Sequence, residues 1–284
     1  MTASQAADHG IGRERLRSSD VAHPFQGVNV FDQGTLGLEQ RCRALQTKLP
    51  RFARFSGITA ALLTGVPLPP RLKLDNTVHV AVPRGNRTLV GRGIRGHTYL
   101  RTPGDSRDWR GLRLSSVERM WCELAADLAL EDLVAAGDYV VHHRLPHTSI
   151  PLLERAVDGW PSRRGRQKLA DALGLLDVNA ESPQESRLRV ILTLGGVRGL
   201  VANLPLRTSG GYSYRLDIGI PAHRVFIEYQ SDEHHTGTRR GDLTRLSRIQ
   251  ADGWFGIEVG ADDLNEPVEL CDRIHRVLAA RPVQ

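Results

Sequence analysis

The sequence predicts an α/β fold, because strand-like and helix-like apolar spacings occupy different parts of the chain. Apolar side chains fall at every second position in residues 78–82 and again in residues 212–229, which is the period of a half-buried strand. Between these regions, Val117, Met120, Trp121 and Leu124 recur at three- and four-residue steps, which is helical spacing. With 284 residues, 40% of them hydrophobic, the chain is long enough for two compact domains.

The first seventeen residues predict two short helices separated by a turn. Thr2 can cap the first helix and Gly10 permits the turn, which is a helix-turn-helix pattern. Arg13, Arg15 and Arg17 would then be free to contact phosphates or a DNA groove. Residues 24–30 can supply a wing strand, so we expect a winged-helix-like and β DNA-binding region over residues 1–110. A plain terminal helical hairpin is the alternative.

Residues 56–96 extend this region. A short helix is expected over residues 56–63, ended by the Gly65-Val-Pro67 segment, and a strand follows at residues 78–83. Glycines among arginines at residues 84–96 suggest a hairpin loop, which either lies along a phosphate backbone or is a solvated turn. Together with the first thirty residues, residues 56–69 resemble the N-terminal part of AbiEi-type antitoxins, which are DNA-binding repressors. That resemblance adds a cognate toxin to the expected partners.

Residues 111–175 are expected to form a helical connecting region. Ser116 can cap its first helix, and a second helical pattern runs from Leu130 to His142. Three histidines lie at the C-terminal end of this helix, His142, His143 and His147. The partial negative charge there favours positively charged side chains, so we expect these histidines to be caps and not metal ligands. The basic segment 161–168 opens the next helix and marks the junction with the last domain.

The last domain, residues 176–284, contains the candidate chemistry. Alternation in residues 212–220 places Asp217 on the face opposite Leu216 and Ile218. After a turn at Pro221, a second strand puts Glu228 and Gln230 on one face, and a hairpin would bring Asp217 beside Glu228. Converging carboxylates suit Mg²⁺ or Mn²⁺, although two acids on the solvated face of a hairpin have the same pattern.

Residues 180–265 resemble the Vsr-like endonuclease domains of actinobacterial proteins, which belong to the PD-(D/E)XK class. The matching features, in chain order, are Glu181-Ser-Pro-Gln-Glu185, Asp217, Glu228, His234-His235, Arg239-Arg240, Arg245 and Gly253-Trp254.

The resemblance implies a restriction-endonuclease-like mixed sheet flanked by helices, which hydrolyses phosphodiesters with Mg²⁺ or Mn²⁺. It also assigns roles to individual residues. Asp217, Glu228 and the Tyr229 carbonyl would hold the metal, and His235 would transfer protons or hold phosphate. The DNA backbone would be bound by Arg239, Arg240 and Arg245.

Three positions leave alternatives open. Gln230 stands where the wider class has lysine, and it can orient a water molecule but carries no charge. Ser231 replaces a glycine that would shape the following turn. Glu185 completes a capping box with Ser182, ahead of Pro183, and is equally a candidate third metal ligand, with Glu181 a weaker one.

Charge is unevenly distributed along the chain, whose formal net charge is +6. Residues 1–175 hold 25 Lys and Arg against 17 Asp and Glu, whereas residues 176–284 hold 13 against 15. This division fits an N-terminal part that binds phosphates and a C-terminal part whose acids bind a cation. Cys42, Cys122 and Cys271 lack zinc-site spacing, and with no signal peptide or long apolar run we expect a cytoplasmic protein without membrane contact.

The sequence therefore predicts a metal-dependent DNA endonuclease targeted by an N-terminal DNA-binding module. One alternative is a non-catalytic regulator of the AbiEi type with a degenerate nuclease fold, which the Gln230 and Ser231 departures favour. Another is an RNA-processing nuclease with the same site, because nothing in the chain excludes RNA. Whether a homodimer forms to cut both strands stays open.

Overall fold

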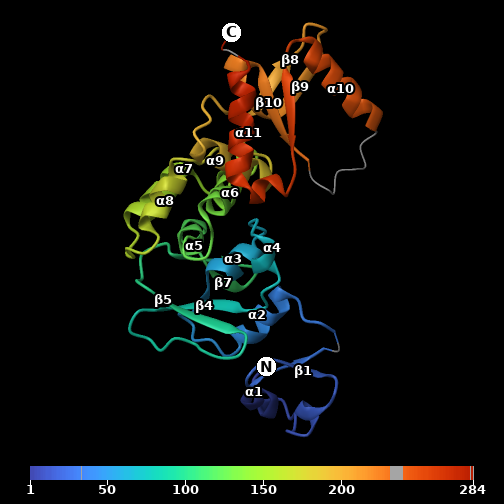
Figure 1. Cartoon of the computed structure of the whole chain (residues 1–284). Helices are drawn as coiled ribbons and strands as arrows, with labels where there is room; N and C mark the ends of the chain where they lie inside the picture. The colour runs from blue at the N-terminus through green and yellow to red at the C-terminus, as the bar shows by residue number, and fades with distance from the viewer. Residues whose placement is uncertain (33, 231–238, 282, 284) are drawn as a thin grey trace. The chain divides into compact units, whose positions relative to one another are not determined.

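The computed structural model describes the whole chain except residues 33, 231–238, 282 and 284, and it leaves the side chains of residues 239, 240 and 242 undescribed. The protein is a mixed α/β protein, as predicted, and its described strands form three sheets (Figure 1). Contacts within the chain divide it into two compact units. The first comprises residues 1–128 and 151–169, and the second comprises residues 129–150 and 170–284. Residues 111–175, expected as one connecting region, are thus shared between the units.

The first unit begins with helix α1, Ala3–Asp8, and Thr2 is its N-cap, as predicted. Thr2 Oγ1 accepts a hydrogen bond from the Gln5 amide at 3.3 Å, and Gln5 Oε1 accepts one from the Thr2 amide at 2.8 Å. The predicted second helix is instead a single 3₁₀ turn, Arg15–Arg17. The Ser-Ser-Asp sequence that follows favours turns over helix and ends the segment early.

Where a wing strand was expected, the structure has a two-stranded antiparallel sheet of β1, Val21–Phe25, and β2, Val28–Phe31. Helix α2, Leu38–Gln46, packs on it. A second sheet has the strand order β5-β4-β3-β7-β6. Its strands are β3 Arg54–Phe55, β4 Val78–Pro83, β5 Ile94–Tyr99, β6 Ser106–Trp109 and β7 Leu112–Ser115.

The expected hairpin loop at residues 84–96 is wrong, because β4 and β5 pair in parallel from Val78 opposite Ile94 to Pro83 opposite Tyr99. The intervening segment folds back over β5 at Gly96. A Cβ atom there would lie 2.2 Å from the Leu89 carbonyl oxygen, so only glycine permits this close approach.

Two helices of the first unit lie where the sequence predicts them. Helix α3, Gly57–Leu63, and α5, Val117–Leu124, pack against each other, and Ser116 Oγ caps α5. The short α4, Pro70–Lys73, and most of α7, Ile150–Asp158, also belong here, while α8, Arg166–Leu173, contains the boundary between the units.

The second unit contains α6, Leu130–Val141, and α9, Pro183–Leu194, which pack together through a buried polar network. The Asp138 carboxylate, 1% exposed, accepts hydrogen bonds from Arg189 Nη2 at 2.8 Å and from Ser186 Oγ at 2.7 Å. The Asp177 amide donates to its other oxygen at 2.8 Å. This network fixes α9 and therefore the first turn in which Glu185 lies.

The sheet of the second unit is mixed and flanked by helices, as expected. Its strands β8 Val201–Arg207, β9 Ser213–Ile220 and β10 Val225–Tyr229 are antiparallel neighbours. Helix α10, Arg239–Ala251, then leads to β11, Phe255–Val259, which is parallel to β10. The strand order is β11-β10-β9-β8.

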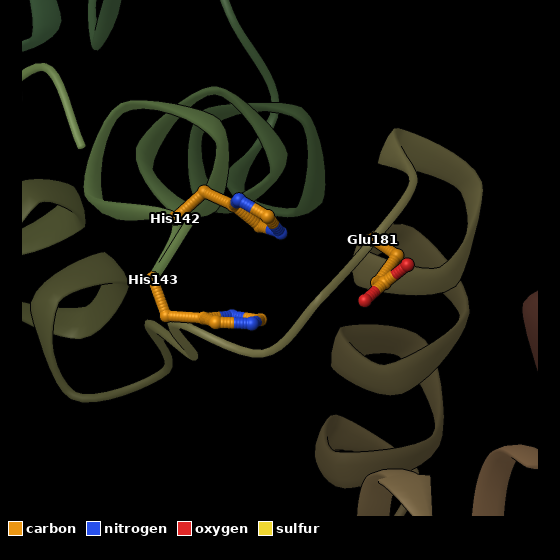
Figure 2. A group of neighbouring side chains, drawn as sticks. All are labelled: His142, His143 and Glu181. Atoms are coloured by element: carbon orange, nitrogen blue, oxygen red, sulfur yellow. The ribbon is translucent and has the colours of Figure 1, made fainter. Parts of the chain in front are cut away.

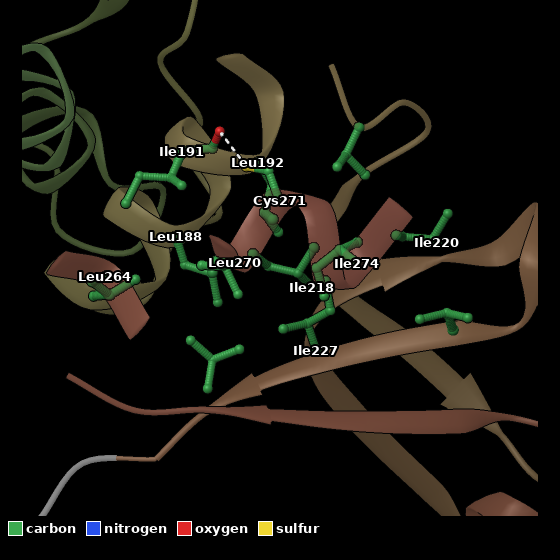
Figure 3. Packing of buried hydrophobic residues seen from close by; sticks show 13 residues of the cluster. Leu188, Ile191, Leu192, Ile218, Ile220, Ile227, Leu264, Leu270, Cys271 and Ile274 are labelled. Carbon is green, nitrogen blue, oxygen red and sulfur yellow. Dashed lines mark hydrogen bonds between the residues drawn. The ribbon is translucent and has the colours of Figure 1, made fainter. Parts of the chain in front are cut away.

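Two apolar clusters cover opposite faces of this sheet. On one face, Ile218 and Ile227 pack against Leu188 of α9 and Ile274 of α11, Pro267–Ala279 (Figure 3). On the other face, Ile249 of α10 packs against the sheet. Cys42, Cys122 and Cys271 are buried, unpaired thiols, consistent with small core residues. None of the described helices combines the length and apolar character needed to span a membrane.

Candidate active site

The predicted hairpin is present and brings Asp217 beside Glu228. A 3₁₀ turn, Pro221–His223, and Arg224 in the left-handed conformation, with φ of 48°, connect β9 to β10. Val225 lies opposite Ile220 and Ile227 lies opposite Ile218. One further step of this antiparallel register places Glu228 opposite Asp217.

The regular pairing of β9 is interrupted at Asp217, which the alternation did not predict. The Tyr229 amide donates to the Asp217 carboxylate at 3.0 Å. On the other side, Asn203 of β8 lies between the pairs Ala202–Ile218 and Leu204–Leu216 and has a left-handed φ of 49°.

The apolar faces of β9 also change at this point. Leu216 packs with Phe226 and Ile249, whereas Ile218 packs with α9 and α11. The expectation of one continuous polar face through Asp217 is therefore wrong. Asp217 lies at a strand irregularity and is partly buried, where a side chain is held more rigidly than on an open face.

The electrostatic environment disfavours negative charge on Asp217. Burial raises the pKa of its carboxyl group to about 6, and the Glu185 and Glu228 carboxylates act in the same direction. The Tyr229 amide and the Arg245 guanidinium oppose this shift and do not cancel it. A half-buried carboxyl group beside two further acids is an environment that a bound cation would relieve.

Glu185 fulfils only part of its predicted capping role, and part of its carboxylate stays available for the predicted metal-ligand role. Ser182 Oγ accepts a hydrogen bond from the Glu185 amide at 3.1 Å, which confirms the helix cap. The Glu185 carboxylate does not return to the Ser182 amide. Its Oε2 instead accepts from the Glu181 amide at 3.2 Å and from Asn203 Nδ2 at 3.0 Å. Among the described residues nothing hydrogen-bonds its Oε1, which leaves that oxygen for another ligand.

Arg245 was expected to contact the DNA backbone, but it binds the candidate site itself. Its Nη1 donates to Glu228 Oε2 at 2.7 Å and its Nη2 to Glu228 Oε1, so both oxygens of this carboxylate are engaged. Its Nη2 also donates to the Arg215 carbonyl at 3.1 Å. Each Glu228 oxygen keeps a second lone pair, so a metal that binds the side of the carboxylate facing Arg245 must displace this guanidinium.

The acids of this site can hold an Mg²⁺-type ion if Asp217 is its main protein ligand. The ligand atoms of Glu185, Asp217 and Glu228 do not all lie within 4.8 Å of one another in the described chain. Mg²⁺ needs few protein ligands, because it usually keeps several water molecules and takes one or two carboxylates. A partly buried carboxyl group with a raised pKa and a neighbouring Glu185 oxygen meets that requirement.

The other predicted residues are distributed as follows. Tyr229 is half-buried against the core. Exposed Gln230 follows β10, and its amide donates to the Val259 carbonyl at 2.8 Å. His235 lies outside the described residues, as do His234 and Ser231. Arg239 and Arg240 begin α10, and their side chains lie outside the described part of the chain.

The N-terminal arginines are not equivalent. Arg13 and Arg17 are exposed, as expected for residues that contact a phosphate backbone. Arg15 was expected to be free, but its guanidinium forms two 2.7 Å bonds to Asp20 and lies 4.8 Å from the centre of the Phe31 ring. The 3₁₀ turn brings Asp20 back to Arg15, which the sequence pattern did not indicate.

Asn203 is the site residue that the sequence interpretation missed. It supports Glu185 and lies opposite Asp217, although it precedes the hairpin. A signal was available, since asparagine tolerates the left-handed conformation better than other side chains and an asparagine inside a strand therefore suggests an irregularity.

Comparison with known proteins identifies partial relatives. Two uncharacterized proteins of Mycobacterium tuberculosis, from two strains, are each 33% identical to this chain over 129 residues. The alignment covers 44% of this chain and 48% of each relative, so the chain spans about half the length of the curated relatives it matches. No family model matches the chain, and no solved structure shows significant similarity to it.

Proposed function

We propose that the second unit is a metal-dependent DNA endonuclease that hydrolyses phosphodiester bonds and that the first unit delivers it to DNA. The observation that carries this proposal is the environment of the Asp217 carboxyl group. Its carboxyl group lies at a strand irregularity between two other acids, and its pKa is raised to about 6. Burial raises the pKa of Asp138 to about 6 as well, but that carboxylate is paired with Arg189 in a structural network. Among the described residues, Asp217 accepts a hydrogen bond from the Tyr229 amide and pairs with no cation, which is the feature that favours a metal site.

The order of elements in the second unit supports the same proposal. Helix α9 is followed by the antiparallel strands β8, β9 and β10, then by α10 and the parallel strand β11. Acids lie on the helix and on the two central strands, as the resemblance to PD-(D/E)XK nucleases implies. A restriction-endonuclease-like architecture is therefore part of the proposal.

A bound Mg²⁺ or Mn²⁺ would activate a water molecule and neutralise charge on the phosphate. Asp217, the Tyr229 carbonyl and Glu185 would hold it, joined by Glu228 once Arg245 has left. Arg245, once it has left Glu228, can bind the substrate phosphate. Gln230 would orient the attacking water, and His235 would transfer a proton or hold phosphate.

The test is cleavage of a supercoiled plasmid in Mg²⁺ or Mn²⁺. Wild type should nick the plasmid, and Asp217→Asn and Glu228→Gln should each abolish nicking. Glu258→Gln is the matched control, because Glu258 is the exposed partner of Glu228 on β11 and is not one of the proposed ligands. Equal loss in all three variants, or none, would count against the assignment.

The second candidate is a non-catalytic DNA-binding regulator with a degenerate nuclease fold. The ion pair between Arg245 and Glu228 favours it, because an acid that is already neutralised has less need of a metal. A regulator should bind DNA without divalent metal and leave it intact. A cognate toxin is a proposed partner only in this case. RNA in place of plasmid DNA distinguishes the ribonuclease alternative, since the same residues would act on either.

A further inference from the structure

His142, His143 and Glu181 form a group of side chains that the proposed nuclease does not use. The histidines end helix α6 and Glu181 precedes α9, so the packing of these helices brings them together. One ligand atom from each lies within 4.8 Å of the others. Within the described residues, no other group of three His, Cys, Asp or Glu side chains meets this distance. Figure 2 shows both imidazole rings facing the carboxylate.

The hydrogen bond of His143 prepares its other ring nitrogen to bind a metal. Nδ1 lies 3.0 Å from the Val178 carbonyl oxygen. A carbonyl oxygen only accepts hydrogen bonds, so Nδ1 carries the proton and the neutral ring keeps its lone pair on Nε2. Metal-binding histidines are oriented in this way by a carbonyl or carboxylate on the nitrogen that does not bind the ion.

The hydrogen bonding of His142 does not prepare its ring for metal binding as that of His143 does. Its Nδ1 lies 3.4 Å from the Arg144 amide, which is a long contact for a hydrogen bond. Binding a metal through Nε2 would require the proton to move to Nδ1 and would break this contact. Because Arg144 is exposed, water can replace it. The ring centres of His142 and His143 are 4.6 Å apart, close enough for both to reach one ion.

Glu181 already has two cationic partners. Arg144 Nη2 lies 2.9 Å from Oε1, and Arg215 Nη2 contacts Oε2. Both guanidinium side chains are largely in solvent, with 55% and 44% of their surface exposed, so such pairs contribute little stability. A divalent ion would therefore compete with the arginines for the carboxylate.

We propose that His142, His143 and Glu181 bind a divalent transition-metal ion, with Zn²⁺ as the leading candidate. Two imidazole nitrogens with one carboxylate oxygen suit Zn²⁺ and Co²⁺ and do not suit Mg²⁺, which prefers oxygen ligands only. A cavity of about 220 Å³, lined in part by His142, Glu181, Tyr139 and His147, lies at the group. It leaves room for a water molecule or a small anionic ligand in the remaining coordination position.

The test is Co²⁺ and Zn²⁺ binding to the full chain, without Mg²⁺ and in an Asp217→Asn background. That background removes Asp217, the first ligand of the proposed nuclease site, so that loss of binding in the histidine variants reports on this group. Co²⁺ should give visible absorption that saturates at one equivalent, and Zn²⁺ should displace it. His143→Gln and Glu181→Gln should each weaken binding by ~100-fold or more.

Two further variants make the result specific. His147→Ala is the matched control, because His147 lines the same cavity, stacks on Tyr139 and is not one of the proposed ligands. It should leave the affinity unchanged within about threefold. Arg144→Ala removes a competitor of the metal and should tighten binding, an effect that a merely structural role for the cluster would not produce.

Several results would overturn the proposal. These are the absence of saturable Co²⁺ binding by the folded protein, equal affinity in His143→Gln, and equal losses in His147→Ala and His143→Gln. Circular dichroism of each variant separates loss of the site from loss of the fold.

Discussion

Replacing Asp217 by asparagine should stabilise the second unit above about pH 6 and leave it nearly unchanged in acid. The folded-state pKa of Asp217 is about 6, against 3.8 for an unperturbed aspartate. The folded protein therefore binds this proton more tightly than the unfolded chain does. Its stability should fall as the pH rises from about 4 through about 6, because the charged form is disfavoured only in the fold.

The size of the effect follows from the shift. A difference of about two pKa units corresponds to about 3 kcal/mol of unfolding free energy, reached above pH ~6. Asparagine has no charge to desolvate, and its Oδ1 can still accept the Tyr229 amide. The gain in Asp217→Asn should therefore approach, without exceeding, this value at pH ~8 and vanish near pH ~4.

Native-state hydrogen exchange of the β10 amides is a suitable assay, because it reports on the second unit alone. Protection factors are compared for wild type, Asp217→Asn and the control Glu258→Gln at both ends of the pH range. The reasoning is refuted if Asp217→Asn destabilises the unit in alkali, or if its effect is the same in acid and alkali.

Four further predictions concern other parts of the molecule. Arg189→Leu leaves Asp138 buried without its cation and should lower the unfolding free energy by about 3–5 kcal/mol, measured by urea denaturation, while Asp138→Asn should cost less. Gly256→Ala would place a Cβ atom 2.5 Å from the Phe226 ring and should cost about 1–3 kcal/mol, whereas Gly12→Ala, with nothing within 4 Å, should be nearly neutral in the same assay. If the first unit binds DNA, Arg13→Ala and Arg17→Ala should each reduce the slope of log affinity against log salt by about 1, and Arg15→Ala should change it less because Arg15 is paired with Asp20. Arg245→Met frees both oxygens of Glu228 and should strengthen Mn²⁺ binding in a calorimetric titration; unchanged affinity would argue that Glu228 is not a ligand.

Local patterns in the sequence predict several of the individual elements. Alternation and the turn at Pro221 are enough to predict that Glu228 lies beside Asp217, because a hairpin fixes its own register and the observed pairing runs to Ile227 and Ile218. The Thr2, Ser116 and Ser182 caps follow from short-range chemistry in the same way.

Features that depend on distant segments were not predictable in this way. The irregularity at Asp217 needs Asn203 on another strand, and the Arg245 pair needs the position of α10. The parallel pairing of β4 and β5 brings the intervening segment back over β5, where the Leu89 backbone lies close to Gly96. His142 and Glu181 meet only because α6 and α9 pack together, and no local pattern specifies that packing.

Mn²⁺ titration by calorimetry at pH ~7.5, into wild type, Asp217→Asn and Glu258→Gln, tests the central claim most directly when plasmid nicking is scored on the same preparations. We expect wild type and Glu258→Gln to bind Mn²⁺ and nick, and Asp217→Asn to do neither while remaining folded. Nicking that survives in Asp217→Asn, or a folded wild type that holds DNA yet neither binds Mn²⁺ nor cleaves, would contradict the account.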